Sequence, residues 1–460
     1  PGLEDVGPTG SRAGAVIDRI MKLDDAAVDH ALDDLVTRFS DRHRDLASVF
    51  DANAERVSVF LDPGIELTPA RKRFVGACFT HEYSIEGACL ANPSIVPHPV
   101  QDDSGSLRFV MSVRGIGEGH RSSIGFRTGS ISPQGAVSFD PPSRFAQITA
   151  GVPGVHHRSV FHSKLDKLGD DFENVSLLLA KLLPTFDDAQ LDAALAEYAS
   201  DLSMRRLDPA TLQHITDLSH WAYEASFPEE TEISERVLWP HAPPEYHGME
   251  DARFVRFVDD DGVVSYLGTY TAFDRSNISL QMLRTTDFRT FYSSPIAGAA
   301  ALGKGLALFP RRINGRYAAL TRSDRETNGI ATTDDLHHWP TSQTLQVPKE
   351  YWEVLQLGNC GSPVELEEGW LMLTHGVGPM RTYSIGALLL DRDDPSEVIA
   401  RSVDPLVFPD DRHRDGYVPN VVYTCGGLVH GEHLVLPYGV ADQWIACATV
   451  PVEALLSTMR

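Results

Sequence analysis

The sequence PPEYHGMEDARF, residues 243–254, places two adjacent carboxylates and an arginine just before an alternating apolar run. Neighbouring side chains of a strand point to opposite faces, so only one of Glu250 and Asp251 can face a given site. Arg253 alternates with Asp251 and could share its face, where its charge would lower the pKa of the acid. A general acid at neutral pH needs the opposite shift. The motif therefore predicts either an acid in an apolar, substrate-filled site or a surface salt bridge.

A second set of polar residues could bind an oxyanion. His375 ends an apolar run in the sequence THGV, and Arg381 and Tyr383 follow six and eight residues later. Cations and hydroxyl groups that converge in this way would suit phosphate. Three more basic residues could join them: Lys304, Arg312 and Arg322. The alternative is that His375 is an ordinary buried histidine at a turn.

Other chemistries find little support in the sequence. The glycine-rich RGIGEGHRSSIGF (114–126) lacks the GK[ST] of a phosphate-binding loop and does not match GxGxxG. It predicts a turn that could bring Arg114, His120 or Ser123 toward a ligand. No HExxH motif or dense histidine cluster indicates a metal site. No GxSxG motif indicates a serine hydrolase. We therefore predict no metal and no cofactor.

The elements that must position these residues are mostly short strands, and they repeat. A glycine turn followed by a strand of about eight residues recurs, at 104–114, 261–273, 314–324, 367–377 and 430–440. Just upstream, a second element recurs at 92–96, 250–254, 308–312, 361–366 and 419–423. Its last four copies start 58, 53 and 58 residues apart, and the first gap of 158 residues (250 − 92) contains a helical region. Five such copies predict a five-bladed β-propeller, with a β-sandwich as the alternative.

In a propeller, residues at matching ends of these strands meet at one mouth of the central channel. Here these positions are polar and differ from copy to copy: Arg114, Tyr270, Arg322, His375 and Tyr438. Divergent polar residues favour a binding pocket over residues that merely mark strand ends.

Two regions, roughly 14–60 and 165–228, have helical periodicity. Pro184 predicts a break in the second region, and Asp187 or Asp188 predicts a helix cap. The predicted fold is all-β: a five-bladed β-propeller with an N-terminal helical segment and a helical insertion between blades one and two. The predicted boundaries are 1–70 for the N-terminal segment, 71–460 for the propeller and 163–235 for the insertion.

Composition narrows the classes of partner. The 460 residues carry a net charge of −24 (40 − 64), which argues against nucleic acids and anionic membranes but not against a neutral sugar. The five cysteines are widely spaced and form no CxxC, which favours reduced thiols and a cytoplasmic location. No apolar stretch approaches the ~18 residues of a membrane span, and we see no signal-peptide pattern. A homo-oligomer is compatible with the sequence.

The repeats resemble glycoside hydrolase family 130, the mannoside phosphorylases and related β-1,2-mannosidases. The resemblance covers roughly residues 75–160 and 240–455 and rests on NPSIV, GMEDARF, LFPRRINGRY, GSPVELEEGWLMLTHGV, YSIGALLLDRDDPSEVIARS and DGYVPNVVYTCG. It implies a five-bladed propeller and an inverting reaction without a metal, in which inorganic phosphate is the co-substrate and α-mannose 1-phosphate the product. Both helical regions lie outside the family pattern and could affect substrate choice or oligomerisation.

The resemblance also implies roles for individual residues. Asp251 falls on the catalytic acid of the family's GxEDPR motif, with Ala252 where proline is usual. This acid is thought to protonate the glycosidic oxygen through a hydroxyl of the bound mannose. The substrate-binding positions fall on Asn92, Ser94, Arg114, Glu250 and Asp442. The phosphate-binding positions fall on His375 and Tyr383, with Arg312 and Arg322 as further candidates.

The predicted activity is phosphorolysis of β-mannosides to α-mannose 1-phosphate and a shortened acceptor sugar. Family members that hydrolyse instead lack the phosphate cluster and use glutamates to activate water. His375 and Tyr383 together favour phosphorolysis, whereas Glu82, Glu86 and Glu118 leave hydrolysis of β-1,2-linked mannosides open. A non-catalytic sugar-binding propeller is a third possibility, and the EDxR, HG and YGxAD motifs argue against it.

Overall fold

The computed structural model describes residues 12–61, 64–169, 171–200 and 207–460, and the chain divides into two compact units, Pro1–Ser84 and Ile85–Arg460. The described part of the first unit is helical. Its helices are α1 (Arg12–Met21), α2 (Asp25–Phe39), α3 (Leu46–Val57) and α4 (Pro69–Cys78). A side chain just before the first turn of α2, α3 and α4 accepts a hydrogen bond from a backbone N–H that would otherwise lack a partner. These capping residues are Asp24, Asp45 and Thr68.

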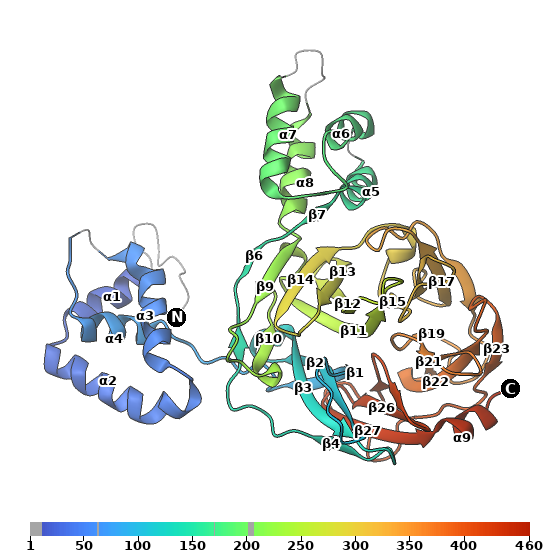
Figure 1. Ribbon diagram of the computed structural model, residues 1–460. Helices are drawn as coiled ribbons and strands as arrows, with labels where there is room; N and C mark the ends of the chain where they lie inside the picture. Colours follow the sequence, from blue (N-terminus) through green and yellow to red (C-terminus); the bar gives the residue numbers. More distant parts are fainter. Residues whose placement is uncertain (1–11, 62–63, 170, 201–206) are drawn as a thin grey trace. The chain divides into compact units, whose positions relative to one another are not determined.

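The described part of the second unit is mainly β, which confirms the predicted class. Most of its strands form five antiparallel groups (Figure 1). Group one contains β1 (Cys89–Pro97), β2 (Leu107–Ile116), β3 (Ser122–Ile131) and β4 (Val137–Phe139). Group two contains β11 (Gly248–Val258), β12 (Val264–Phe273), β13 (Ile278–Thr285) and β14 (Thr290–Pro295). Group three contains β15 (Ala307–Leu308), β16 (Tyr317–Thr321), β17 (Asn328–Thr333) and β18 (Gln343–Gln346).

The last two groups complete the set. Group four contains β19 (Gln356–Asn359), β20 (Val364–Glu365), β21 (Trp370–Gly378), β22 (Thr382–Leu390) and β23 (Val398–Arg401). Group five contains β24 (Val422–Tyr423), β25 (Leu428–His430), β26 (His433–Val440) and β27 (Trp444–Pro451), and α9 (Val452–Ser457) follows it. Four short strands extend groups one and two into one sheet: β5 (Gln147–Ile148), β6 (Gly151–Pro153), β9 (Tyr223–Ser226) and β10 (Arg236–Leu238).

Each group is hydrogen-bonded to the next, and group five is hydrogen-bonded to group one. Phe254 N donates to Ser94 Oγ (3.1 Å) between groups one and two, and Val258 N donates to Pro310 O (2.9 Å) between groups two and three. Leu357 N donates to Glu326 O (3.1 Å) between groups three and four, and Tyr383 N donates to Asn420 O (2.9 Å) between groups four and five. Cys425 N donates to Pro93 O (2.8 Å) between groups five and one. The chain therefore brings its last strands back against its first ones, as Figure 1 shows.

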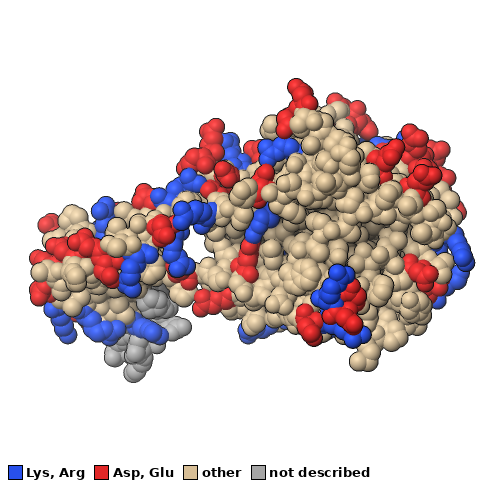
Figure 2. Space-filling model, turned by 90° about the horizontal axis from the view of Figure 1, so that it is seen from below, with Lys and Arg blue, Asp and Glu red and all other residues tan. Residues whose placement is uncertain are grey.

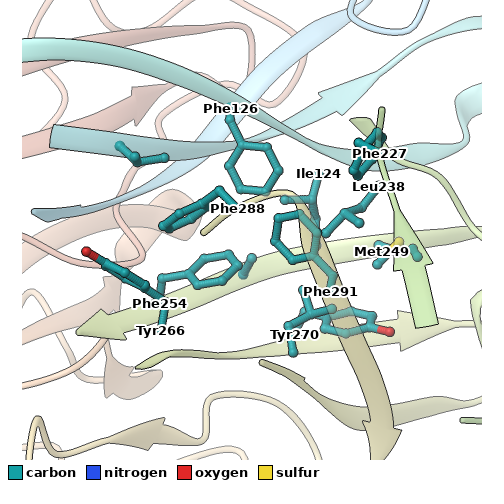
Figure 3. Close-up of a cluster of buried hydrophobic side chains, with 14 of the residues drawn as sticks. Ile124, Phe126, Phe227, Leu238, Met249, Phe254, Tyr266, Tyr270, Phe288 and Phe291 are labelled. Carbon is teal, nitrogen blue, oxygen red and sulfur yellow. The ribbon is translucent and has the colours of Figure 1, made fainter. Parts of the chain in front are cut away.

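Apolar side chains fill the space between neighbouring groups. Figure 3 shows the cluster between groups one and two, where Phe126 stacks on Phe291 with ring centroids 5.5 Å apart and meets Phe288 edge-on at 5.6 Å. Similar clusters lie between groups two and three, three and four, four and five, and five and one. Because a large apolar side chain contributes about 1.5–3 kcal/mol when fully buried, these clusters hold each group against its neighbours.

A helical insertion lies between groups one and two in chain order. Its helices are α5 (Arg158–Leu168), α6 (Phe172–Leu179), α7 (Asp188–Ser200) and α8 (Pro209–Ser219), and the short strands β7 (His156–His157) and β8 (Thr185–Phe186) pair beside them. Asp187 caps α7 by accepting the Gln190 N–H at 2.8 Å. The insertion contacts group three, where Ser159 Oγ donates to Asp335 at 2.5 Å and the His157 and His337 rings stack with centroids 3.5 Å apart.

The cysteines and the surface charges bear on the expected partners. All five cysteines lie in the described part of the chain and are unpaired. On the face drawn in Figure 2, Lys and Arg side chains lie among Asp and Glu, without a broad basic area. Among the described helices, none combines the length and the apolar character needed to cross a membrane.

Candidate active site

A cavity of about 200 Å³ brings together most of the predicted site residues, and every strand group or a segment next to it contributes to its wall. The residues that line it are Asn92, Arg114, Asp251, Lys304, Arg322, His375, Arg381, Tyr383, Val418, Val421, Tyr423 and Asp442. Seven of these were assigned from the sequence: Asn92, Arg114, Asp251, Arg322, His375, Tyr383 and Asp442. The repeat thus places chemically different residues around one space.

Asp251 occupies a bulge in β11. The register between β11 and β12 shifts between Glu250 and Arg253, and Asp251 has a φ of 56°. Asn92 occupies a bulge of the same kind in β1, with a φ of 51°. Asn and Asp tolerate this left-handed conformation better than most non-glycine residues. The bulges bring both side chains to the cavity, where Asn92 Nδ2 donates to Asp251 Oδ1.

Only one of the two adjacent carboxylates, Asp251, lines the cavity, as expected, but the bulge leaves both carboxylates in contact with one arginine. Arg114 contacts both carboxylates: its Nη2 donates to Glu250 Oε1 at 2.6 Å, and its Nη1 lies 3.6 Å from Asp251 Oδ1. Strand alternation holds only for regular pleated backbone, and the left-handed residue interrupts it here. Glu250 also accepts from Lys304 Nζ at 2.6 Å and does not line the cavity. Its carboxylate therefore holds two cations in place.

The charges around Asp251 decide its protonation. Burial raises the pKa of Asp251, but the positive charges of Lys304, Arg114 and Arg253 outweigh burial and hold this pKa below its ordinary value. The hydrogen bond from Asn92 acts in the same direction. The protein groups around Asp251 therefore favour the ionised form of the acid.

The second carboxylate of the cavity has the opposite shift. Burial is the main cause that raises the pKa of Asp442; Arg114 opposes it, and the negative charge of Asp251 adds to it. Asp442 has a φ of 47°, so this residue also lies in a strained turn. The two carboxylates thus differ in their affinity for a proton.

The opposite part of the wall could hold an anion. Burial, followed by the charges of Arg322 and Arg253, lowers the pKa of His375 well below its ordinary value, so the imidazole is neutral at pH 7. Its ring lies parallel to that of Tyr383, with centroids 6.0 Å apart. Arg322 is fixed by bonds from Nε to Leu357 O (3.0 Å) and from Nη2 to Arg325 O (2.7 Å). Arginine, a neutral imidazole and a phenol together present donors that suit phosphate.

Gly358 makes room for this part of the wall. It lies opposite His375 in the β19–β21 ladder. A Cβ at residue 358 would overlap His375 Cε1 and would lie 2.6 Å from Arg322 Cδ. The absence of a side chain at Gly358 therefore allows His375 and Arg322 to approach each other.

Three predicted site residues lie outside the cavity and are corrections to the predicted site: Glu250, whose contacts are given above, Ser94 and Arg312. Ser94 is fully buried, and its Oγ accepts the Phe254 N–H at 3.1 Å, so it joins groups one and two instead of facing a substrate. Arg312 donates from Nε to Asp259 Oδ1 at 2.7 Å, and its guanidinium lies 3.9 Å from the Tyr317 ring centroid.

Two of the matching strand-end residues also lie outside the cavity. Tyr270 is buried, and its hydroxyl donates to Glu245. Tyr438 packs against His413 with ring centroids 6.3 Å apart. A strand end therefore reaches the cavity in some groups and the core in others.

Tyr423 lines the cavity although no sequence motif singled it out, and its hydroxyl accepts a hydrogen bond from Arg253 Nη2 at 2.8 Å. Its place at the end of the repeated element PNVVY is the signal that could have found it. Lys304 and Arg381, named from the sequence only as further cations, both line the cavity. In the described part of the chain, no cluster of three or more His, Cys, Asp or Glu side chains is placed to hold a metal ion.

Comparison with known proteins identifies the family. Residues 220–460 match the model of glycoside hydrolase family 130, which is described as beta-1,4-mannooligosaccharide phosphorylase. The chain belongs to glycoside hydrolase family 130. This match begins after β1–β3, so Asn92 and Arg114 lie outside the matched part of this family 130 chain.

Curated members of family 130 resemble this chain over about half its length. A 1,2-beta-oligomannan phosphorylase of Thermoanaerobacter sp. (strain X514) is 33% identical and is aligned over 48% of this chain and 74% of its own. A beta-1,2-mannobiose phosphorylase of Listeria innocua is 32% identical, over 48% of this chain and 63% of its own. A solved structure of the beta-1,2-mannobiose phosphorylase from Listeria innocua with beta-1,2-mannobiose superposes with a TM-score of 0.47 at 22% identity, over 81% of this chain and 92% of the other.

Proposed function

We propose that this protein catalyses the inverting phosphorolysis of β-mannosides, giving α-mannose 1-phosphate and a shortened acceptor. One observation carries the proposal: a single cavity is lined by a carboxylic acid, Asp251, and by Arg322, His375 and Tyr383, whose hydrogen-bond donors suit phosphate. The relatives named above are mannoside phosphorylases, which supports the same reaction. Their names include β-1,2 linkages and the family description includes β-1,4 linkages, so both are candidate substrates.

We also propose that the five strand groups are the blades of a five-bladed β-propeller. The hydrogen bonds and apolar clusters between successive groups, and between groups five and one, support this arrangement. We place the N-terminal helical segment before Ile85, where the two compact units divide, instead of ending it at residue 70. The helices α5–α8 are then an insertion between blades one and two.

In this proposal Asn92, Arg114 and Asp442 bind the mannose, and Asp251 is the acid. A phosphate oxygen forms a bond to the anomeric carbon while the bond from that carbon to the glycosidic oxygen breaks. The leaving oxygen takes a proton that Asp251 supplies through a hydroxyl of the mannose. Attack and departure occur on opposite faces, so the β-mannoside gives the α-phosphate.

Phosphate would also prepare the acid. The cations Lys304, Arg114 and Arg253 by themselves lower the pKa of Asp251. An anion bound beside Lys304 and Arg322 offsets their positive charge and so raises the pKa of Asp251. The higher pKa favours the protonated carboxyl group that a general acid needs. Protonation of the acid is then coupled to the arrival of the co-substrate.

The carboxylates of the cavity favour phosphorolysis over hydrolysis. An inverting hydrolase needs a second carboxylate as a base for water. Among the described residues that line the cavity, only Asp251 and Asp442 are carboxylates, and in this proposal Asp442 binds the mannose. Glu82 pairs with Arg42 in the first unit, and Glu86 pairs with Arg127 at 2.5 Å. Neither these two glutamates nor Glu118 lines the cavity.

The test is turnover of β-1,2- and β-1,4-mannobiose with and without inorganic phosphate. We expect phosphate-dependent formation of mannose 1-phosphate, with the α-anomer identified by NMR. Asp251→Asn should lower kcat by about 10²–10⁴-fold, the usual contribution of a general acid. Asp259→Asn is the matched control, because Asp259 pairs with Arg312 outside the cavity. Equal release of free mannose without phosphate would overturn the proposal.

A further inference from the structure

A pair of exposed aromatic rings lies near the cavity. His120 and Tyr417 come from distant parts of the chain, and the Tyr417 hydroxyl lies 3.2 Å from His120 Nδ1. Their ring planes differ by 26° and their centroids are 6.1 Å apart. The two rings thus lie side by side with planes close to parallel, and together they are called the aromatic platform.

The His120 side of the platform is fixed next to the cavity. Ser122 follows two residues after His120, and its Oγ accepts Arg114 Nη2 at 3.2 Å. Arg114 lines the cavity. Ser122 also pairs with Gly248, two residues before Glu250, so the loop with His120 is attached to the strand that carries the acid.

The Tyr417 side is fixed in the same way. Val418, the next residue, lines the cavity. A Cβ at Gly416 would lie 2.5 Å from Ala441 Cβ, so this loop packs closely against the turn that carries Asp442. Tyr417 is nevertheless 47% exposed, which leaves the ring available to a ligand.

The size of the cavity indicates what the platform could bind. A volume of about 200 Å³ is smaller than the ~300–1,000 Å³ of sites for drug-sized ligands. This size suits one mannose unit and a phosphate, and a second sugar ring then extends to the rim.

The stereochemistry of the reaction indicates the side on which the second ring lies. Inversion places the leaving group on the face of the anomeric carbon opposite to the nucleophile. The anion-binding residues Arg322, His375 and Tyr383 come from groups three and four, whereas the platform comes from loops next to groups one and five. In Figure 1, β2 and β3 of group one lie across the common centre from β17 of group three and β19 of group four. A leaving sugar that points away from the phosphate thus points toward group one, and His120 lies in the loop between β2 and β3.

We propose that His120 and Tyr417 bind the pyranose ring of the leaving or acceptor sugar, with its C–H face against the aromatic platform. This inference rests on the proposed function, because that function defines which sugar leaves. The hydrogen bond to His120 holds Tyr417 in place, so the ring is ordered before the sugar arrives. Tyr417 is then a specificity-determining residue for the acceptor and takes no part in bond breaking.

Synthesis from mannose 1-phosphate and an acceptor, mannose or β-1,2-mannobiose, separates the two substrates. Tyr417→Ala should raise the KM of the acceptor about 5- to 30-fold, as for loss of an important aromatic contact, while the KM of mannose 1-phosphate stays within about twofold of wild type. Tyr417→Phe keeps the ring and should retain most of the affinity. Tyr292→Ala is the control, since Tyr292 is similarly exposed (49%) but lies on β14, the last strand of group two. An unchanged acceptor KM in Tyr417→Ala, or equal increases in both KM values, would overturn the inference.

Calorimetric titration with β-1,2-mannobiose distinguishes failure of this inference from failure of the proposed function, because it needs no turnover. Weaker binding by Tyr417→Ala than by wild type and Tyr292→Ala supports the platform even if no phosphate-dependent turnover is found. Equal binding by all three proteins rejects the platform, even if wild type produces mannose 1-phosphate.

Discussion

Replacement of Gly358 by alanine should damage phosphate binding selectively. The new Cβ would overlap His375 Cε1 and would lie 2.6 Å from Arg322 Cδ, so at least one of these side chains must move. Gly358 does not have a positive φ, and alanine therefore introduces crowding without backbone strain. The predicted effect is on the position of two anion-binding residues and not on the strand itself.

The magnitude follows from the cost of crowding. Inserting a methyl group into a well-packed region costs about 1–3 kcal/mol. If His375 and Arg322 move to relieve the crowding, the free energy of phosphate binding weakens by a similar amount. The KM of phosphate then rises about 5- to 150-fold, since about 1.4 kcal/mol corresponds to a factor of ten. The KM of the β-mannoside should change less than about threefold, because Asn92, Arg114 and Asp442 lie on the other part of the wall.

The assay measures the rate of phosphorolysis, first with phosphate varied at saturating mannoside and then with mannoside varied at saturating phosphate. Gly386→Ala is the matched control: its Cβ would lie 2.5 Å from Trp352 Cη2, so it crowds group four without facing His375 or Arg322. This control should reduce stability and leave the KM of phosphate unchanged. A folded Gly358→Ala protein with a wild-type KM for phosphate would refute the assignment of His375 and Arg322 to the anion. Equal increases in both KM values would refute the division of the cavity into two parts.

Two further predictions concern pH. Lys304 is the cation that lowers the pKa of Asp251 most, so Lys304→Met should raise this pKa and move the descending limb of the kcat–pH profile, at saturating phosphate, to higher pH; an unmoved limb would contradict the assigned acid. Burial, followed by the charge of His157, lowers the pKa of His337 to about 3. The contribution of neutral His337 to the free energy of unfolding is therefore complete above about pH 6.5, the ordinary pKa of histidine. Below that pH the contribution declines by up to about 1.4 kcal/mol per pH unit. His337→Gln should therefore lose less free energy of unfolding than wild type between pH 7.5 and 5.5, measured by urea unfolding, and equal losses would contradict this.

The sequence predicted the strand class and most of the cavity wall because both repeat. The repeat places equivalent positions around one centre and grouped five strand-end residues. Three of them, Arg114, Arg322 and His375, line the cavity, whereas Tyr270 and Tyr438 do not. The corrections have a common cause. Ser94 and Arg312 have the right residue types, but one faces a neighbouring strand and the other pairs with Asp259.

The sequence by itself determined the strand repeat, the excess of negative charge and the residue types that could act as acid and anion ligands. Only the tertiary structure decided which of them meet. The bulges at Asn92 and Asp251 break the regular alternation of a strand, and they bring Glu250 and Asp251 to the same arginine. The physical reason is that the alternation of apolar and polar residues in a strand indicates only which side chains are buried. A contact between residues 159 positions apart, such as Asn92 with Asp251, depends on how separate strand groups pack.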